Sequence, residues 1–483
     1  MSSAAWSIAE PLNSRAPIRP RTTDSPIPFT PIQRRMWEFL ARKGRPLSLR
    51  MCASAVRVLG PLDIGHLQRS IEALIHRHES LRARLIVLDG TAQQHIDAPA
   101  EYRLNLVDLS NHSEGHTEVK VLVQEFLDQQ IDLMTGPLFE AKLWKLSDRE
   151  HVLVLLIDHF VCDGVSNGIL TREMWTLYDQ SVRGQSFSLP ALAVQFADYA
   201  VWHQQTHAAW MQGHESYWRE RLKGVQPLEV PLDMPPEGAN NSSGATTYVP
   251  FGDTLSAALR DVARRERTLL SLVVLAAYVI VISNWCRRDD LLVEFVSHGR
   301  HRRPELQNVV GYLSNLIYFR IALSDHDTFR SLLTRIQLEF SSAFQHQDFD
   351  RVPDFIPECQ SEVGFNWQPT CWVGGRLDHH VVLECASELD RHPPWGRDPD
   401  RSQGPEGGSI RIQPFAARSP VSVKFGPVMF DTMSGIYMAV AHQANPLAQQ
   451  AIERFGQNML FAMGELAKNP SVRIAVATGH MSW

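Results

Sequence analysis

The organisation of this chain follows from residues 151–164, which read HVLVLLIDHFVCDG. The opening part, His151 to Ile157, is a continuous apolar run of strand length. An unbroken run predicts a strand buried on both faces, because a half-buried strand alternates apolar and polar residues. Polar residues then end the run, and a helical pattern extends from about Ser166 to Tyr178. We therefore expect a central strand, a polar turn, and a helix that leaves the turn.

The turn carries side chains that suit proton transfer. His159 is held by the end of the strand, and an ordinary histidine pKa of about 6.5 suits it to take a proton from an amine or an alcohol. Asp163 lies across the turn, where its carboxylate would orient the loop or neutralise a buried cation. Gly164 leaves room for a backbone N–H to approach a developing oxyanion. The pattern HxxxDG alone is a weak signal in a chain with 20 histidines.

A competing motif overlaps this turn. Residues 164–168, GVSNG, fit the GxSxG turn of serine hydrolases, with Ser166 as the nucleophile. That turn requires the strand to run directly into the first glycine, whereas residues 158–163 separate Ile157 from Gly164. A serine hydrolase stays open as an alternative hypothesis. The favoured interpretation of Ser166 is a helix N-cap.

Helix and strand patterns alternate on either side of this stretch. Before it, one helix is predicted at 31–42 and a second after an N-cap at Asp63. A strand is predicted at 82–90. After it, a fully buried helix and two strands are predicted at 268–283, 290–297 and 316–323. A last helix carries its apolar side chains on one stripe, at Ile452, Phe455, Met459, Met463 and Leu466. The chain is therefore expected to form two α/β lobes of comparable size.

Composition sets the boundaries between these parts. A Ser-, Pro- and Arg-rich start predicts a disordered tail at residues 1–27, followed by a first lobe at 28–185. Pro, Gln and aromatic residues mark a crossover at 186–245, and a second lobe follows at 246–483. Within it, 386–411 is a long loop rich in Pro, Gly and charge, which predicts a mobile or functional segment.

The overall composition and charge argue against several classes of protein. The 483 residues are 44% hydrophobic and carry a formal charge of -6, which argues against a nucleic-acid or membrane partner. The N-terminus lacks a signal peptide, and the apolar stretch at 268–283 is shorter than the roughly 18–20 residues that span a bilayer. The 6 cysteines form no CxxC pair. They predict reduced thiols in a cytoplasmic protein.

Other candidate sites are weaker. His379 and His380 would point to opposite faces of a strand, so we expect no shared metal ion. Residues 406–409, EGGS, lie in a loop and are expected to form a turn. The arginines at 300, 302 and 303 form a basic cluster for which we expect a structural role. No phosphate loop, dinucleotide fingerprint or zinc spacing is present.

From about residue 26 onward, the chain resembles the condensation domains of nonribosomal peptide synthetases. The similar segments occur in the family's order: PFTPIQRRMWEF, GPLDIGHLQRSIEALIHRHESLRARL, DHFVCDGVSNGIL, VQFADYAVW, YWRERLKGVQPLEVPLD, VEFVSHGRHRRPELQNVVGYLSNLIYFRI and SEVGFNWQP. The third segment matches the family's HHxxxDG motif, which accounts for the hydrolase-like pattern. The resemblance implies two chloramphenicol-acetyltransferase-like lobes in a V, with a tunnel between them that is open at both ends.

The resemblance also implies a reaction. An acyl, peptidyl or polyketide chain would pass from the phosphopantetheine thioester of a carrier protein to an amine or hydroxyl acceptor, giving an amide or an ester. Phosphopantetheine would arrive with the donor carrier protein, so no permanently bound cofactor and no metal are expected. The acceptor would be a free small molecule or carrier-bound. Because no adenylation or carrier domain follows, the expectation is a free-standing enzyme of natural-product biosynthesis.

The family's site residues map onto five positions. His159 matches the catalytic histidine, and Gly164 matches the glycine whose backbone faces the thioester. Asp163 matches the aspartate that an arginine holds, with Arg300 as the expected partner, and Asn315 matches an asparagine in the floor of the second lobe.

One position departs from the family pattern. Asp158 stands where the family has its first histidine. A carboxylate there would raise the pKa of His159 if the two side chains meet, and would have little effect if they face apart. The departure leaves open a non-catalytic member that only binds carrier proteins.

Overall fold

The computed structural model describes residues 17–22, 26–42, 51–226, 228, 230–231, 244–300, 303–324, 326–347, 349, 352, 363–369, 375–377, 381–383, 410–414, 425–432, 435–443, 446–479 and 481. The helices are α1 Pro31–Arg42, α2 Ile64–Arg77, α3 Gly115–Leu127, α4 Gly164–Val182, α5 Phe196–Arg221, α6 Gly252–Arg265, α7 Leu270–Cys286, α8 Phe329–Gln345, α10 Pro446–Lys468 and α11 Ile474–Thr478. Short 3-10 turns occur at Glu79–Arg82 and Pro304–Leu306. The strands are β1 Met51–Leu59, β2 Ala83–Leu88, β3 Thr91–Ile96, β4 Asn105–Asp108, β5 Phe139–Ser147, β6 Glu150–Asp158, β7 Gly244–Pro250, β8 Asp290–Ser297, β9 Asn315–Ala322, β10 Gly364–Pro369, β11 Gly375–Leu377, β12 Val381–Leu383, β13 Ile410–Pro414, β14 Val428–Thr432 and β15 Gly435–Gln443.

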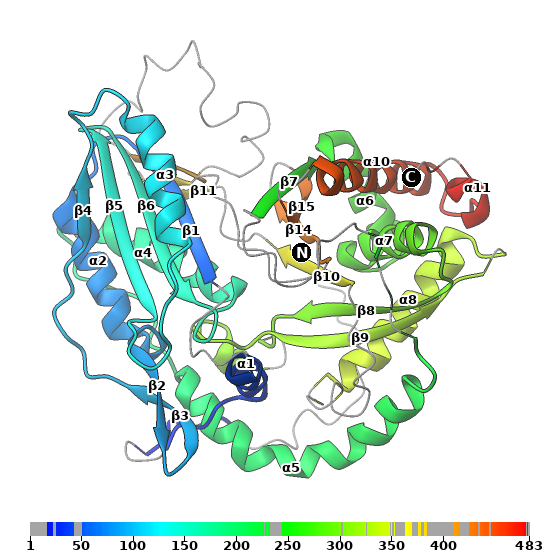
Figure 1. Cartoon of the computed structure of the whole chain (residues 1–483), viewed down its shortest axis with the longest axis horizontal. Helices are drawn as coiled ribbons and strands as arrows, with labels where there is room; N and C mark the ends of the chain where they lie inside the picture. The colour runs from blue at the N-terminus through cyan, green and yellow to red at the C-terminus, as the bar shows by residue number, and fades with distance from the viewer. Residues whose placement is uncertain are drawn as a thin grey trace.

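The expected central strand is β6, and both of its faces are buried. Among the described residues, the first sheet has the order β11-β12-β13-β1-β6-β5-β4. Leu153, Leu155 and Ile157 face one apolar cluster, which also contains residues of α2 and α4. The alternate residues Val154 and Leu156 face a second cluster, which contains residues of α3. The continuous apolar run is therefore explained by helices on both sides of one strand (Figure 1).

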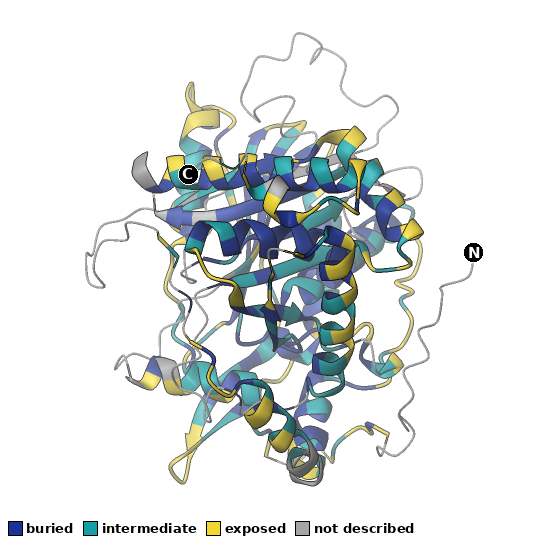
Figure 2. Ribbon diagram, turned by 90° about the vertical axis from the view of Figure 1, so that its right-hand side faces the viewer, coloured by how far each residue is buried: buried dark blue, intermediate teal, exposed yellow. Residues whose placement is uncertain are grey.

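The second lobe is built around α7. A sheet of order β7-β15-β14-β10-β8-β9 forms one layer, and α6, α8 and α10 pack around α7. All of α7 from Ser271 to Ser283 is buried, so the predicted fully buried helix is confirmed. The stripe predicted on the last helix is also buried within this core. Figure 2 shows the buried residues concentrated between the layers of both lobes.

The two halves of the chain share the first sheet. β13 pairs with β1 in antiparallel register, with Val56 opposite Pro414 and Leu59 opposite Arg411. β12 and β11 continue the sheet outward from β13. Strands from within 246–483 thus complete the first lobe, so the predicted boundary at 245 and 246 does not separate the two sheets.

The crossover contains a helix that the sequence analysis did not predict. α5 runs beneath both lobes and connects them (Figure 1). Part of the expected disordered tail packs beside its start: Ile18 is buried in a cluster with Phe196 and Leu306. Arg21 donates to Asp198 of α5 at 2.9 Å and pairs with Glu79 at 2.9 Å. Within residues 17–22, an apolar side chain and an ion pair thus contact the rest of the chain.

Some expectations fall outside the described residues. These are His379, His380, Arg302, residues 406–409 and nearly all of the loop 386–411. In the described part of the chain, no single helix is long and apolar enough to cross a membrane. Among the described residues, one pair of helices, α6 and α7, passes that test together on length and composition, with a bend of 108° between them.

Candidate active site

The turn after β6 is closed by Asp158 and anchored from α1. Oδ1 of Asp158 accepts the N–H of Phe160 at 2.7 Å, and its backbone oxygen accepts the N–H of Val161 at 3.1 Å. An aspartate that bonds the backbone two residues on is a typical turn former. Gln33 of α1 donates Nε2 to the Phe160 carbonyl oxygen at 2.8 Å. These bonds fix the backbone on both sides of His159.

The carboxylate of Asp163 joins the two halves of the chain. Oδ1 accepts the N–H of Ser166 at 2.8 Å and thereby caps α4. Oδ2 accepts Nη1 of Arg300 at 2.8 Å and the N–H groups of Leu313 and Ser314 at 3.0 Å each. Burial alone would raise the pKa of Asp163, but Arg300 and these hydrogen bonds lower it below its usual value. The structure places Arg300 against Asp163, as the resemblance implied.

Ser166 is part of the same buried network. Its Oγ accepts Nη2 of Arg300 at 2.8 Å and the N–H of Gly311 at 3.0 Å. Its hydroxyl lies 2.8 Å from Oδ1 of Asp163 and 2.9 Å from the Gly311 oxygen. A fully buried hydroxyl with these partners does not fit a hydrolase nucleophile. The expected N-cap role is also wrong, because α4 starts at Gly164 and Asp163 caps it.

Close backbone approach lets the segment from Gly299 to Asn315 reach this network. Gly299 has φ of 73°, and a Cβ there would lie 2.0 Å from the Leu313 oxygen. A Cβ on Gly311 would lie 2.2 Å from Cδ2 of Phe196 in α5. Both positions therefore require glycine, which allows the second half to present Arg300 and Tyr312 to the first.

His159 stands beside Tyr312 in a partly buried position. The two ring centroids are 4.4 Å apart, with an angle of 43° between the planes. Burial disfavours the imidazolium, but electrostatic interactions with Cys52 and Tyr312 and a hydrogen bond with Cys52 hold the pKa of His159 well above its usual value. Oδ1 of Asp158 accepts the N–H of Phe160 within the same turn.

Cys52 is a site residue that the sequence analysis missed. In β1 it lies opposite Ile157 of β6, next to the turn that carries His159. Its Sγ donates to the backbone oxygen of Cys162 at 3.5 Å. A hydrogen bond with Cys162 and the positive charge of His159 outweigh burial and lower the pKa of Cys52 to about 6.

Two further contacts come from the second lobe. A Cβ on Gly164 would lie 2.9 Å from both Nε2 and Oε1 of Gln368, which extends from β10. Asn315, at the start of β9, donates Nδ2 to the Gln347 oxygen at 2.7 Å and accepts Nη2 of Arg35 at 3.3 Å. Asn315 thus connects the start of β9 to α1, while Gln368 faces the start of α4.

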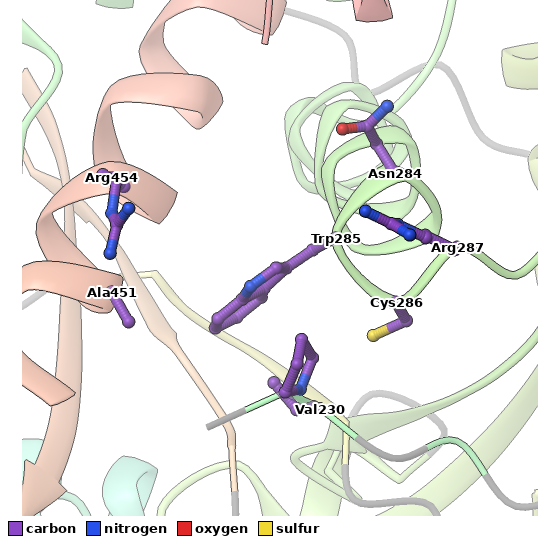
Figure 3. A pocket seen from close by; sticks show the side chains of 8 residues that line it. Val230, Asn284, Trp285, Cys286, Arg287, Ala451 and Arg454 are labelled. Carbon is purple, nitrogen blue, oxygen red and sulfur yellow. The ribbon is translucent and has the colours of Figure 1, made fainter. Parts of the chain in front are cut away.

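A separate cavity of about 530 Å³ lies in the second lobe. Its lining residues lie at the end of α7, on α10 and on a segment beside them (Figure 3). They are Val230, Pro231, Asn284, Trp285, Cys286, Arg287, Ala451 and Arg454. None of these residues belongs to the network around His159. Among the described residues, no group of three or more His, Cys, Asp or Glu side chains is arranged to bind a metal ion.

Comparison with known proteins shows which family this chain is similar to. The profile of the family described as "Condensation domain" matches residues 24–351. One of the linear gramicidin synthase proteins of Brevibacillus parabrevis is 32% identical over 397 residues, which cover 78% of this chain and 8% of that protein. Chondramide synthase from Chondromyces crocatus is 30% identical over 344 residues, covering 70% of this chain and 9% of that protein. The chain spans less than a tenth of the length of either relative.

Solved structures share the fold. The X-domain from teicoplanin biosynthesis superimposes with a TM-score of 0.77 at 20% identity, covering 95% of this chain and 99% of that one. The first condensation domain of the calcium-dependent antibiotic synthetase gives a TM-score of 0.74 at 16% identity, covering 94% and 99%. The SgcC5 protein from Streptomyces globisporus gives 0.70 at 20% identity, covering 92% and 100%. The expected two-lobed, mixed helix and strand fold is therefore confirmed.

Proposed function

This chain belongs to the condensation-domain family, and on that premise we propose that it is an acyltransferase. It would transfer an acyl, peptidyl or polyketide chain from the phosphopantetheine thioester of a carrier protein to an amine or a hydroxyl. The product would be an amide or an ester. The partner carrier protein would supply phosphopantetheine, so the chain itself would need no resident cofactor.

One observation carries the proposal: a partly exposed His159 is held where residues of both lobes meet. Asp163 and Arg300 fix the loop on one side, and Gln33 fixes it on the other. α4 begins at Gly164, and the first N–H groups of a helix have no partners within the helix. Such groups favour negative charge, so they suit the oxyanion of a tetrahedral intermediate. An activated thioester and an acceptor held together there would gain mostly from proximity.

Asp158 favours a second candidate, a module that binds acyl carrier proteins without turnover. It occupies the position of the family's first histidine, and the side chain is fully buried. One structural relative was solved as a complex of an X-domain with the protein OxyB, so members of this fold also bind other proteins. The two candidates differ in whether acyl loss follows binding.

The experiment follows the donor by intact-protein mass spectrometry. An acyl-loaded carrier protein is incubated with the chain and a pool of amines and alcohols, with His159→Ala in parallel. Acyl loss with a matching amide or ester supports the transferase, provided that His159→Ala retains its circular dichroism spectrum and lowers the rate by about 10²–10⁴-fold. Full activity of His159→Ala would overturn the mechanism. Carrier binding without turnover by the wild type would favour the binding module.

A further inference from the structure

Within the described residues, no hydrogen bond at Nδ1 sets the orientation of the His159 imidazole. In many functional sites this nitrogen donates to a carboxylate or a carbonyl oxygen, which fixes the ring. The torsion that turns an imidazole about its Cβ–Cγ bond is broad and roughly two-fold, so the side chain alone does not select one orientation. The orientation of His159 therefore depends on the side chains that pack against its ring.

This orientation matters because the two nitrogens of His159 differ in access. Nδ1 is buried, so Nε2 is the nitrogen that can take a proton from an acceptor. A half-turn about the Cβ–Cγ bond would place the carbon Cε1 where Nε2 stands, and proton transfer at that point would stop. A general base has to lie within hydrogen-bond reach of the proton that it removes, so smaller rotations also weaken catalysis.

The ring of Tyr312 packs directly against His159. The two centroids are 4.4 Å apart, which is at the short end of the separations of aromatic pairs, about 4.5–7 Å. Tyr312 is itself buried, in an apolar cluster that includes Phe196 and Trp202 of α5. Its ring therefore cannot move aside without disturbing this cluster, and it forms a fixed wall for the imidazole.

The backbone around Tyr312 is tied on both sides to the turn after β6. On one side, the N–H of Gly311 donates to Oγ of Ser166 at 3.0 Å. On the other side, the N–H of Leu313 donates to Oδ2 of Asp163 at 3.0 Å. These bonds hold the segment that carries the tyrosine ring at a set distance from the turn that carries the histidine, although the two belong to different halves of the chain.

We propose that Tyr312 is a positioning residue, whose ring holds the imidazole of His159 in the orientation that presents Nε2 to the acceptor. This inference rests on the proposed acyltransferase function and adds a further residue to the same site. The flat face of the ring carries the role, because it is the part that contacts the imidazole. Phenylalanine therefore replaces Tyr312, whereas leucine, which is apolar but has no flat face, does not.

The contact is tested first without substrate, by NMR on protein with labelled histidine and tyrosine. The His159 signals are assigned by their loss in His159→Ala. In the wild type, a nuclear Overhauser effect between the two rings and a ring-current shift of the imidazole protons are expected. Tyr312→Phe is expected to keep the shift, and Tyr312→Leu to lose it. Absence of the Overhauser effect in the wild type would overturn the inference, whether or not the variants fold.

The effect on transfer is measured as separate kcat and KM values with an acyl-loaded carrier protein. Tyr312→Leu is expected to lower kcat by about 10²-fold and to leave KM for the donor unchanged, the loss typical of a catalytic group that is misplaced by about 1 Å. Tyr312→Phe is expected to keep most of the wild-type kcat. Each variant is checked for folding by circular dichroism.

The matched control is Tyr199→Leu. Tyr199 packs against the same apolar cluster from α5, where its ring neighbours are Phe196, Trp202 and His203. This variant is expected to keep the wild-type kcat. Equal losses of kcat in Tyr199→Leu and Tyr312→Leu would overturn the inference, because the effect would then belong to the cluster as a whole.

The outcomes separate this inference from the proposed function. If the wild type transfers an acyl group and Tyr312→Leu keeps its kcat, the positioning role is refuted while the acyltransferase function stands. If the wild type transfers none while the Overhauser effect and the shift are present, the acyltransferase function falls and the orientation of His159 by Tyr312 stands.

Discussion

Arg300 and Asp163 form an ion pair of 2.8 Å although they lie on different halves of the chain, and side-chain exposure is only 1% and 2%. Arg300 also donates to the oxygens of His298 and Val309, each at 3.0 Å. The pair therefore fixes the loop of His159 and the segment that carries Tyr312 at the same time. Removing one partner leaves a buried charge without compensation, which is far more costly than losing an exposed pair.

Arg300→Met is expected to lower the free energy of unfolding by about 3–5 kcal/mol, measured by urea denaturation. The matched control is Arg219→Met, which removes an exposed pair with Glu215 within α5. That change should cost less than about 1 kcal/mol. A loss below 1 kcal/mol in Arg300→Met would show that the buried pair does not hold the lobes together.

Two glycines with similar positive φ allow the cost of a steric contact to be separated from the cost of backbone strain. Gly299 and Gly90 have φ of 73° and 76°, but a Cβ on Gly299 would meet the Leu313 oxygen at 2.0 Å, whereas Gly90 faces open space. Gly90→Ala should cost about 1–2 kcal/mol in free energy of unfolding, from the left-handed conformation alone. Gly299→Ala should cost more by at least about 2 kcal/mol, because backbone must also move. Equal losses, compared by thermal and urea unfolding, would contradict the close approach.

His151 predicts a pH dependence of stability. Burial first, and then the charge of Lys145, lower the pKa of His151 to about 4. An unfolded histidine titrates near about 6.5, so between these values the unfolded chain binds more protons at this position. The free energy of unfolding should therefore rise with pH from about 4 to about 6.5. His151→Gln should reduce this slope in urea titrations at half-unit pH steps, and an unchanged slope would refute the assignment.

The contact between the start of α4 and β10 predicts coupling between Gly164 and Gln368. Gly164→Ala would direct a methyl group into the Gln368 amide, which lies 2.9 Å from that position. The amide is the end of a flexible side chain, so we expect a fall in transfer rate without unfolding. Gln368→Ala should restore part of that rate in the double variant, measured as a double-mutant cycle. Additive effects of the two changes would show that the residues do not meet.

The sequence predicted the elements with the most continuous apolar runs. The structure buries β6 from His151 to Asp158 and α7 from Ser271 to Ser283 between neighbouring layers. The ion pair between Arg300 and Asp163 could be predicted only from the family resemblance, because these residues lie far apart in the chain. The helix α5 was missed because it carries polar and aromatic residues along its length and bridges two lobes.

The place of Cys52 was hidden for a different reason. Within MCASAVRVL it is one small residue of a strand, and only the register of β1 on β6 sets it opposite Ile157, next to the turn that carries His159. Strand register depends on pairing across the sheet, which no local pattern specifies. The same reason hid β13, which is short and pairs with β1 from the other half of the chain, and also β12 and β11, which extend the sheet beyond β13.

The pairing of β13 with β1 also has a consequence for synthesis. As the chain leaves the ribosome, β1 can pair with β6 early, but its other edge has no partner until residues 410–414 appear. An open strand edge is a template for pairing with another chain. A ribosome that stalls after the first sheet has formed would therefore release an aggregation-prone fragment, and chaperone demand should be greatest during this interval.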